Sequence, residues 1–371
     1  MHIGIDSRLP YYQVGGISAY VVNLVAALAQ LDSEHRFTVF HSRKDRRDYV
    51  SSQMDGFDRA NLWTPCHHRL ERWTLGAELL RHRLNLLHSP DFIPPACGAR
   101  FRIITVHDLN FLLYPEFLTA ESRRYYNQQI EWAVGTADHI LADSHHTRRD
   151  LIERLAVEPK QVTTVHLAAG PVFRAVHSAE DVSTTLAQLG LAPGFILFVG
   201  TLSPRKNVKT ILAAFELLVR EEGMETKLVL AGARGWLADE LFASLSNSAA
   251  RDRIVHVEGL TDREMAHLYA AAGVLAIPSL YEGFGLPALE AMHCGCPVIA
   301  SNRASLPEVV GEAGILLEPT DVAAWAASIG DILHDSAERQ RLIALGQLQA
   351  QKFSWSKTAA ATMAVYERCL R

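Results

Sequence analysis

The chain has 371 residues, with 36 basic and 41 acidic side chains and a net charge of −5. Apolar residues make up 49% of it and the mean hydropathy is +0.04, as in proteins that fold in water. A chain of this length predicts two domains, because one hydrophobic core rarely serves so many residues. Neither half has an excess of basic side chains, which argues against a nucleic-acid-binding protein.

The sequence shows no membrane-spanning segment, no signal peptide and no zinc-binding cysteine motif. No apolar run reaches the roughly 18 residues of a membrane-spanning helix. The start lacks a basic region followed by an apolar one, so no signal peptide is expected. The cysteines are odd in number and fit no zinc spacing, which favours reduced thiols in a cytoplasmic protein. They are Cys66, Cys97, Cys294, Cys296 and Cys369.

In the first half, apolar runs of strand length alternate with longer helical patterns. A helix is expected from Ile17 to Leu31, where apolar residues recur three and four positions apart. The strands are almost continuously apolar, as expected when both faces of a sheet are covered. The predicted strands are His2–Asp6, Phe37–Phe40, Leu86–Ser89, Ile103–His107, Ile140–Ser144 and Val162–Leu167.

The second half repeats this alternation after Gly194. Its predicted strands are Phe195–Val199, Lys227–Ala231, Ile254–Val257, Val274–Pro278, Val298–Ser301 and Ile315–Leu317. Its predicted helices include Lys209–Arg220, Arg263–Ala272 and Leu286–His293. Strands alternating with helices at this spacing indicate parallel sheets in an α/β protein.

The two series define the expected domains. We predict a first domain over residues 1–170, a linker over 171–193, where periodicity is weak, and a second domain over 194–351. Phe353-Ser354-Trp355-Ser356 opens a last helix, within residues 352–371. Two doubly wound, Rossmann-like domains facing across a cleft are the expected product, and such sheets bind ligands beyond the carboxyl ends of their strands.

The most informative segment runs from Pro278 to Met292 and reads as strand end, glycine-rich loop and helix start. Gly283 and Gly285 allow a ligand to approach the backbone closely. The helix start exposes N–H groups that favour an anion. Glu282 and Glu290 bracket the loop, and such carboxylates can bond sugar or ribose hydroxyls. An ordinary strand–turn–helix with incidental acids is the alternative.

Glu282-x7-Glu290 in this setting resembles the signature of the family-4 retaining glycosyltransferases of GT-B fold. Gly295-Cys296-Pro297-Val298-Ile299-Ala300-Ser301 and Leu306-Pro307-Glu308-Val309-Val310 resemble the same family. The resemblance implies that Glu282 contacts hydroxyls of the donor sugar and that Glu290 binds the nucleotide ribose. It also implies that the last helix packs back on the first domain. The loop amides expected to hold sugar and phosphate belong to Gly283, Phe284, Gly285 and Leu286.

A second candidate site follows the first strand of the second domain, at Val199-Gly200-Thr201-Leu202-Ser203-Pro204-Arg205-Lys206-Asn207. Two adjacent cations at a strand end suit a diphosphate. The alternative is a basic turn that is exposed to solvent and binds nothing. The family commonly has Arg directly after this Gly and Lys five residues later. Lys206 matches that Lys, whereas Thr201 replaces the Arg, so Arg205 is an inferred substitute.

The first domain offers two weaker candidates. Gly15-Gly16 precedes the first long helix, in Gln13-Val14-Gly15-Gly16-Ile17, and could cradle an anion or be a plain turn. The family has a similar loop that touches the donor phosphate. His107 and Asp108 end a strand, and a buried structural histidine is the alternative there. The family frequently places a His here, which implies that His107 bonds the donor sugar near the reacting carbon, with Asp108 supporting the loop.

The resemblance implies a retaining transferase with its donor mainly on the second domain and its acceptor mainly on the first. By their motifs, His107 and Arg205-Lys206 look most like those of bacterial mannosyltransferases of polysaccharide assembly. GDP-mannose is therefore the expected donor, and a glycan or lipid-linked molecule the acceptor. No Asp-x-Asp stands in a strand-end loop, so neither a metal nor another cofactor is expected. The alternatives are a nucleotide-sugar epimerase of the same fold and a non-catalytic scaffold; an oxidoreductase would need Gly-x-Gly-x-x-Gly.

One further stretch, His67–Leu87, mixes basic and apolar residues and has two interpretations. It could rest peripherally on the anionic cytoplasmic face of the membrane. The alternative, which we favour, is a solvated amphipathic face. The residues concerned are Arg69, Arg72, Arg81 and Arg83 with Trp73, Leu79, Leu80, Leu84 and Leu86.

Overall fold

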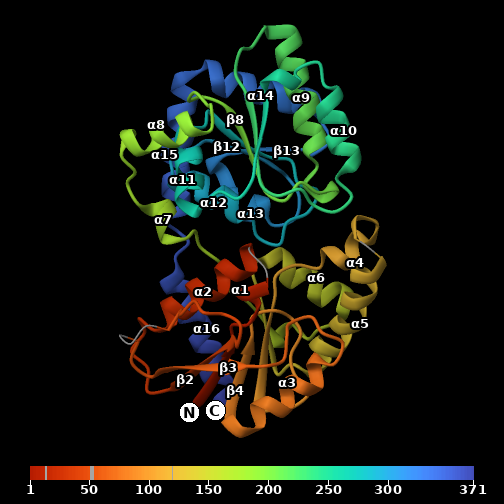
Figure 1. Cartoon of the computed structure of the whole chain (residues 1–371), viewed down its shortest axis with the longest axis vertical. Coiled ribbons are helices and arrows are strands. Elements are labelled where there is room, and N and C mark those ends of the chain that lie inside the picture. Colours follow the sequence, from red (N-terminus) through yellow and green to blue (C-terminus); the bar gives the residue numbers. More distant parts are fainter. Residues whose placement is uncertain (13–14, 51–53, 119) are drawn as a thin grey trace. The chain divides into compact units, whose positions relative to one another are not determined.

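The structure is a computed structural model that describes residues 1–12, 15–50, 54–118 and 120–371 (Figure 1). It separates into two compact units. The first unit comprises Met1–Leu112, Ala120–Leu167 and Phe353–Arg371, and the second comprises Leu113–Thr119 and Ala168–Lys352. Each unit is an α/β layer structure with its own sheet, as the sequence predicts.

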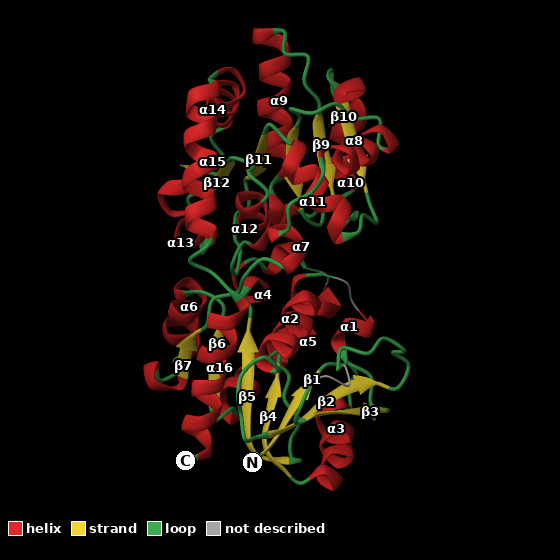
Figure 2. Ribbon diagram, turned by 90° about the vertical axis from the view of Figure 1, so that its left-hand side faces the viewer, coloured by secondary structure: helices red, strands yellow, loops and turns green. Residues whose placement is uncertain are grey.

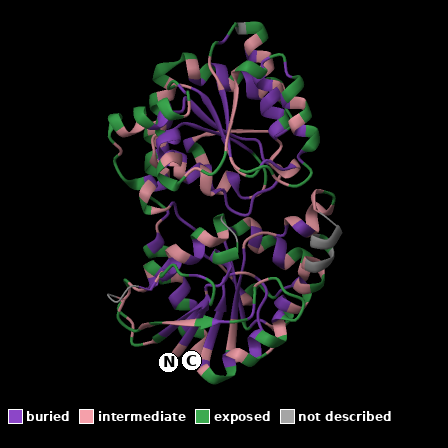
Figure 3. Cartoon of the chain, in the orientation of Figure 1, coloured by how far each residue is buried: buried purple, intermediate pink, exposed green. Residues whose placement is uncertain are grey.

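The first unit is built on a parallel sheet of seven strands in the order β3-β2-β1-β4-β5-β6-β7. Ile5 of β1 lies between Val39 of β2 and His88 of β4 in register. Most residues of the inner strands are buried, as covering on both faces requires (Figure 3). The strands are β1 His2–Asp6, β2 Arg36–Ser42, β3 Phe57–Leu62, β4 Leu84–Ser89, β5 Ala99–Val106, β6 His139–Ala142 and β7 Val162–Thr164.

Helices flank this sheet (Figure 2). They are α1 Leu9–Tyr12, α2 Gly16–Leu28, α3 Glu71–Leu79, α4 Asn110–Leu113, α5 Ala120–Thr136, α6 His145–Leu155 and α16 Trp355–Leu370. The buried face of α2 is formed by Tyr20, Val21, Leu24, Val25 and Leu28, and α16 packs against it and against β4, β5 and β6. The last helix of the chain thus belongs to the first unit.

The second unit has a parallel sheet of six strands in the order β10-β9-β8-β11-β12-β13. Its strands are β8 Ile196–Val199, β9 Leu228–Ala231, β10 Ile254–Val257, β11 Val274–Ile277, β12 Val298–Ser301 and β13 Ile315–Leu317. Its helices are α7 Pro171–Arg174, α8 Ala179–Gln188, α9 Val208–Glu222, α10 Asp239–Asn247, α11 Asp262–Ala271, α12 Leu286–His293, α13 Leu306–Val310, α14 Val322–His334 and α15 Ser336–Ala350. Short 3₁₀ turns occur in both units. Those of the first unit are Leu80–His82 and Pro159–Gln161, and those of the second are Pro115–Phe117, Pro204–Lys206, Arg251–Arg253 and Gly311–Ala313.

The structure adds elements where the sequence indicated none. Residues 171–193, expected as a linker, carry α7 and α8, and both pack against α11 of the second unit. Strand β3 is also absent from the sequence prediction. It pairs only with β2, and its partly exposed residues alternate too little in polarity to mark a strand.

Strand order reverses once in each sheet. In the first unit the chain moves outward from β1 to β2 and β3, then returns to place β4 on the other side of β1. In the second unit the corresponding neighbours are β8 and β11. Loops at the carboxyl ends of such paired strands diverge and leave room for a ligand, so these two positions are where binding residues should gather.

Candidate functional site

The loops that follow β8 and β11 bring three predicted site residues together. Glu282 Oε1 accepts a hydrogen bond from Lys206 Nζ at 2.5 Å, and Glu282 Oε2 accepts one from Arg205 Nη1 at 3.1 Å. Ser279 Oγ donates to Glu282 Oε1 at 2.6 Å. The sequence predicted these charges separately, and the structure joins them into one cluster at the position where strand order reverses.

The side chain of Asn207 and one backbone hydrogen bond hold the first of these loops against the second. Asn207, in the left-handed region with φ 52°, ends the 3₁₀ turn that carries Arg205 and Lys206. Its side-chain amide donates to the carbonyl oxygens of Pro278 at 3.1 Å and Pro319 at 2.7 Å. Leu280 N donates to Arg205 O at 2.9 Å. The position of Lys206 is therefore fixed by Asn207, a residue to which the sequence assigned no role.

Glycines allow this corner to close. Gly200 has φ 145°, and a Cβ added there would lie 3.4 Å from Lys206 Cε. Gly232, with φ 143°, approaches so closely that its Cβ would lie 2.2 Å from Gly200 O, where no side chain fits. The side chain of Lys206 thus packs against the backbone of Gly200, which in turn packs against Gly232.

The electrostatics keep Glu282 ionised. Burial alone would raise the pKa of this carboxyl, but the charges of Lys206 and Arg205 lower the pKa of Glu282 to about 2. The residue is only 8% exposed. One carboxylate between two cations leaves a net positive charge, which suits a diphosphate, while its remaining lone pairs can accept hydroxyl groups.

The glycine-rich loop leads into α12 as the sequence predicts. Gly285 adopts φ 108°, and a Cβ there would lie 2.8 Å from Leu306 Cδ2. Ser305 Oγ bonds the carbonyl oxygens of Glu282 and Phe284, both at 2.8 Å, and fixes the loop. The loop carries Gly283, Phe284, Gly285 and Leu286 to the start of α12, where backbone N–H groups favour an anion.

Glu290 lies one helical turn further along α12. Its Oε2 accepts a hydrogen bond from Tyr269 OH at 2.9 Å. Burial raises the pKa of Glu290 to about 7, against the opposing effect of the Tyr269 bond. In the described part of the chain, no basic side chain pairs with Glu290 as Lys206 and Arg205 do with Glu282. A hydroxyl donor from a ligand would therefore stabilise the charged form of Glu290.

The glycine loop of the first unit is described only in part. Gln13 and Val14 lie outside the described residues. Gly15, with φ 153°, is the residue before α2, and Gly16 is the first residue of that helix. Both are exposed, as a loop that meets a ligand should be.

His107 follows β5 and has a partner at each ring nitrogen. Nδ1 lies 2.6 Å from Asp143 Oδ2, and Nε2 lies 2.8 Å from Pro90 O. A carbonyl oxygen only accepts, so both nitrogens carry protons if the Asp143 carboxylate accepts as well. Burial opposes this charge, yet the neighbouring Asp143 carboxylate raises the pKa of His107 to about 9. Burial also raises the pKa of Asp143, against the lowering effect of the His107 charge. The raised pKa of His107 favours the imidazolium at neutral pH, a state that the sequence did not predict.

A series of buried hydrogen bonds begins beside His107. The His107 ring contacts the Tyr20 ring edge-on, with centroids 5.1 Å apart. Tyr20 OH bonds Thr105 Oγ1 at 3.1 Å, and Thr105 Oγ1 bonds His88 Nε2 at 2.8 Å. His88 Nδ1 in turn bonds Tyr366 OH of α16 at 2.6 Å. This series ties the last helix to the strands that carry His107.

Asp108, the cysteines near α12 and the stretch between residues 67 and 87 lie outside the clusters above. Asp108 supports its loop, since its Oδ1 accepts a hydrogen bond from Asn110 N at 3.0 Å. Cys294 and Cys296 belong to the packing around α12, where burial raises the pKa of both thiols. Of the apolar residues between 67 and 87, Leu79, Leu84 and Leu86 are core residues, so these three are not part of a membrane-facing surface. Trp73 and Leu80 are exposed.

Comparison with known proteins gives the family. The family described as "Glycosyltransferase Family 4" matches residues 14–168, and that described as "Glycosyl transferases group 1" matches residues 187–349. The O-antigen chain mannosyltransferase B of Escherichia coli is 32% identical over 96% of this chain and 97% of its own length. The MMP alpha-(1->4)-mannosyltransferase of Mycolicibacterium hassiacum is 36% identical over 62% of this chain and 54% of its own.

Solved structures share the fold at lower identity. Sucrose-phosphate synthase from Thermosynechococcus elongatus superposes with a TM-score of 0.79 and 23% identity, over 99% of this chain and 98% of that one. HepE from Anabaena, in complex with UDP and glucose, gives 0.76 and 18%, over 98% and 99% of the two chains. Within the described part of the chain, no helix combines the length and apolar character needed to cross a bilayer.

Proposed function

Because this chain belongs to the family-4 glycosyltransferases, of GT-B fold, we propose that it transfers mannose from GDP-mannose to a glycan or lipid-linked acceptor, with retention of the anomeric configuration and without a metal ion. The whole-length similarity to an O-antigen mannosyltransferase supports the choice of sugar and of acceptor class. The observation that carries the proposal is the cluster of the partly exposed Lys206 and Arg205 with the buried Glu282, in the loops after β8 and β11.

This cluster supplies the chemistry that departure of a diphosphate needs. In the proposed front-face displacement, a bond forms between the acceptor oxygen and the anomeric carbon while the bond from that carbon to the phosphate oxygen breaks. The proton of the acceptor hydroxyl passes to the departing phosphate. Lys206 and Arg205 stabilise the charge that develops on the diphosphate, with the N–H groups at the start of α12. In this proposal the two cations supply the positive charge that the departing diphosphate needs, without a metal ion.

We assign the remaining predicted residues to the donor. Glu282 accepts hydroxyls of the mannose, because its carboxylate stays ionised. Glu290 accepts ribose hydroxyls, and Gly15 and Gly16 face phosphate. His107 meets the sugar near the anomeric carbon: its Nε2–H can exchange the carbonyl of Pro90 for a sugar hydroxyl while Nδ1 stays on Asp143.

Nucleotide preference tests the donor directly. GDP should raise the unfolding temperature more than UDP or ADP at equal concentration, because a ligand that binds only the folded state stabilises it. GDP-mannose should also release GDP slowly in water without an acceptor. A clear preference for UDP, the nucleotide present in the HepE structure, would contradict the proposal. Conversion of the sugar nucleotide into an epimer would indicate an isomerase instead, and binding without any turnover would indicate a scaffold.

We also propose peripheral membrane contact through the outer side of α3. Trp73 of α3 and Leu70 and Leu80, which flank that helix, are more than half exposed, and Trp63, seven positions before Leu70, is 67% exposed. Arg43 lies over the Trp63 ring at 3.9 Å. Apolar side chains beside arginine suit the interface of an anionic bilayer. The full chain should co-sediment with phosphatidylglycerol-containing vesicles and not with phosphatidylcholine alone. Trp73→Glu should abolish that binding; equal sedimentation of the variant would refute the proposal.

A further inference from the structure

A small cavity in the first unit lies where its strand order reverses, at the carboxyl ends of β1 and β4. Its volume is about 20 Å³, enough for one hydroxyl group or one water molecule. Its position in the first sheet corresponds to that of the Lys206–Glu282 cluster in the second. The polar residues that line it are Asp6, Cys66, His67, Glu71, Ser89 and Asp91.

Ser89 is the group in this cavity whose bonding capacity is unused. It ends β4 and is 2% exposed, and its hydroxyl has no hydrogen-bond partner among the residues that the structure describes. A buried hydroxyl without a partner is unfavourable, and native proteins rarely keep one without a reason. Such a group is suited to receive a polar atom from a ligand.

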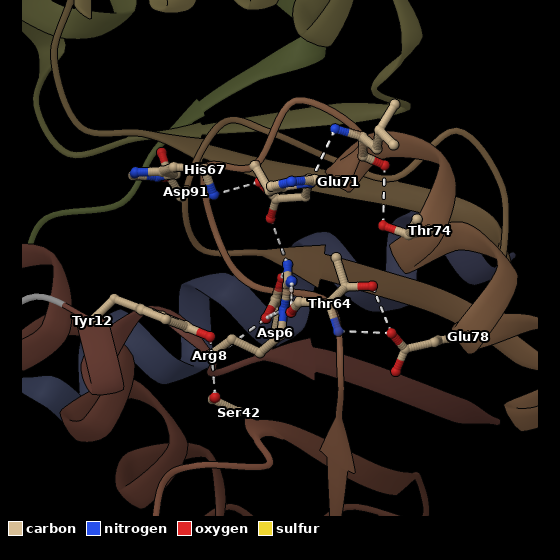
Figure 4. Close-up of polar contacts among 12 residues, drawn as sticks. Asp6, Arg8, Tyr12, Ser42, Thr64, His67, Glu71, Thr74, Glu78 and Asp91 are labelled. Carbon is tan, nitrogen blue, oxygen red and sulfur yellow. Dashed lines mark hydrogen bonds and ion pairs between the residues drawn. The ribbon is translucent and has the colours of Figure 1, made fainter.

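The acids of the cavity are held in position by their own partners. Arg8, 1% exposed, bonds Asp6 Oδ2 and Glu71 Oε1, both at 2.7 Å (Figure 4). His67 Nε2 lies 2.8 Å from Asp91 Oδ2. Each carboxylate oxygen has two lone pairs, so these acids can accept further hydrogen bonds without moving. The cavity therefore places several hydrogen-bond acceptors beside the Ser89 hydroxyl.

Charge decides which ligand chemistry fits. Three carboxyl groups face one guanidinium and one imidazole, so the cavity offers no positive excess to a phosphate or carboxylate. Burial raises the pKa of the Cys66 thiol, which stays protonated and is no nucleophile. Within the described residues, no three metal-binding atoms of this lining come close enough to share an ion. A neutral hydroxyl, which donates to a carboxylate and accepts from serine, fits.

The cavity also adjoins the residue that we place at the reacting carbon. Pro90, which follows Ser89, lines the cavity and accepts the hydrogen bond of His107 Nε2 at 2.8 Å. A sugar whose hydroxyl enters the cavity therefore lies beside His107. On the basis of the proposed function, we propose that this cavity binds one hydroxyl of a neutral acceptor hexose through Ser89 and the carboxylates, and so selects neutral over anionic acceptors.

Ser89→Ala in the full chain tests the assignment, with octyl α-D-mannopyranoside as the probe. Binding is measured by saturation-transfer NMR in the presence of GDP, for the parent glycoside and its monodeoxy analogues at positions 2, 3, 4 and 6. Losing one neutral hydrogen bond should weaken binding of the parent about threefold to tenfold. One deoxy analogue should bind wild type and Ser89→Ala equally, because the partner of Ser89 is already missing. The 6-phosphate of the glycoside should bind neither protein measurably.

Ser7→Ala is the matched control. Ser7 is also fully buried with an unpartnered hydroxyl, but it does not line the cavity, so its variant should bind every probe like wild type. Equal binding of all glycosides to wild type and Ser89→Ala, or none to either, would overturn the inference and assign the cavity to a structural water. Release of GDP from GDP-mannose with Ser89 indifferent would leave the proposed function standing. Ser89-dependent binding without any transfer would refute the proposed function alone.

Discussion

Lys206→Ala should lower kcat/KM for GDP-mannose by about tenfold to a hundredfold or more. Lys206 donates to Glu282 in the free protein, and in the proposed mechanism it meets the diphosphate as negative charge builds on the departing oxygen. A hydrogen bond to a charged group contributes roughly 1.5–3 kcal/mol, which corresponds to that loss. Direct calorimetry of GDP and steady-state rates together measure it.

The loss should be specific to this lysine. Lys209 lies on α9 and forms an exposed ion pair with Glu240, so Lys209→Ala should change the rate by no more than about twofold. Lys206→Arg keeps the charge and should recover part of the activity. Thermal unfolding of each variant shows whether the fold persists. A fully active Lys206→Ala variant would remove this residue from the diphosphate site.

His107→Ala should lower turnover by about tenfold to a hundredfold while affinity for free GDP stays nearly unchanged. The ring belongs to the first unit and is assigned to the sugar, where a fixed donor acts on charge developing in the transition state. The variant leaves Asp143 without its partner, so Asp143→Asn serves as a second variant that keeps the shape of the pair. It should lower the pKa of His107 and also lower turnover. Equal loss of GDP affinity in the Lys206 and His107 variants would contradict this division of roles.

The same pair predicts a pH dependence. The pKa of His107 is about 9 in the folded protein and 6.5 in an ordinary environment. The pair therefore stabilises the fold below about pH 6.5, down to the pH at which Asp143, whose pKa burial raises, becomes protonated. This contribution is lost as pH rises through about 9. Unfolding temperatures of wild type should fall across this window relative to those of Asp143→Asn. Parallel curves for the two proteins would show that the imidazolium contributes nothing.

Elements with an uninterrupted local signal could be predicted from the sequence. Ile254–Val257, Val298–Ser301 and Ile315–Leu317 are strands with the predicted bounds, because short apolar runs end at polar or turn residues. Leu286–His293 is a helix with the predicted bounds, since Gly285 and Pro287 mark its start. By contrast, β3 is an edge strand with mixed polarity, and its existence depends on pairing with β2.

In the candidate site, the residue types could be predicted from the sequence but their hydrogen-bond partners could not. Lys206, Glu282 and His107 stand at strand ends in recognisable motifs, so their types and positions could be read from the chain. Their partners could not. Lys206 and Glu282 are 76 positions apart, and Arg8 and Glu71 are 63 apart, so only the order of strands in each sheet brings them together. The unpartnered hydroxyl of Ser89 likewise has no sequence signal, because it depends on what surrounds it.

Product analysis by NMR tests the central claim most directly. The full chain is incubated with GDP-mannose and octyl α-D-mannopyranoside in excess EDTA, and the anomeric configuration of the new linkage is read together with the release of GDP. The proposed function predicts an α-linked product, matching the α-linkage of the donor, at a rate that the chelator does not change. A β-linked product, or activity that disappears with EDTA and returns only with Mg²⁺ or Mn²⁺, would contradict it.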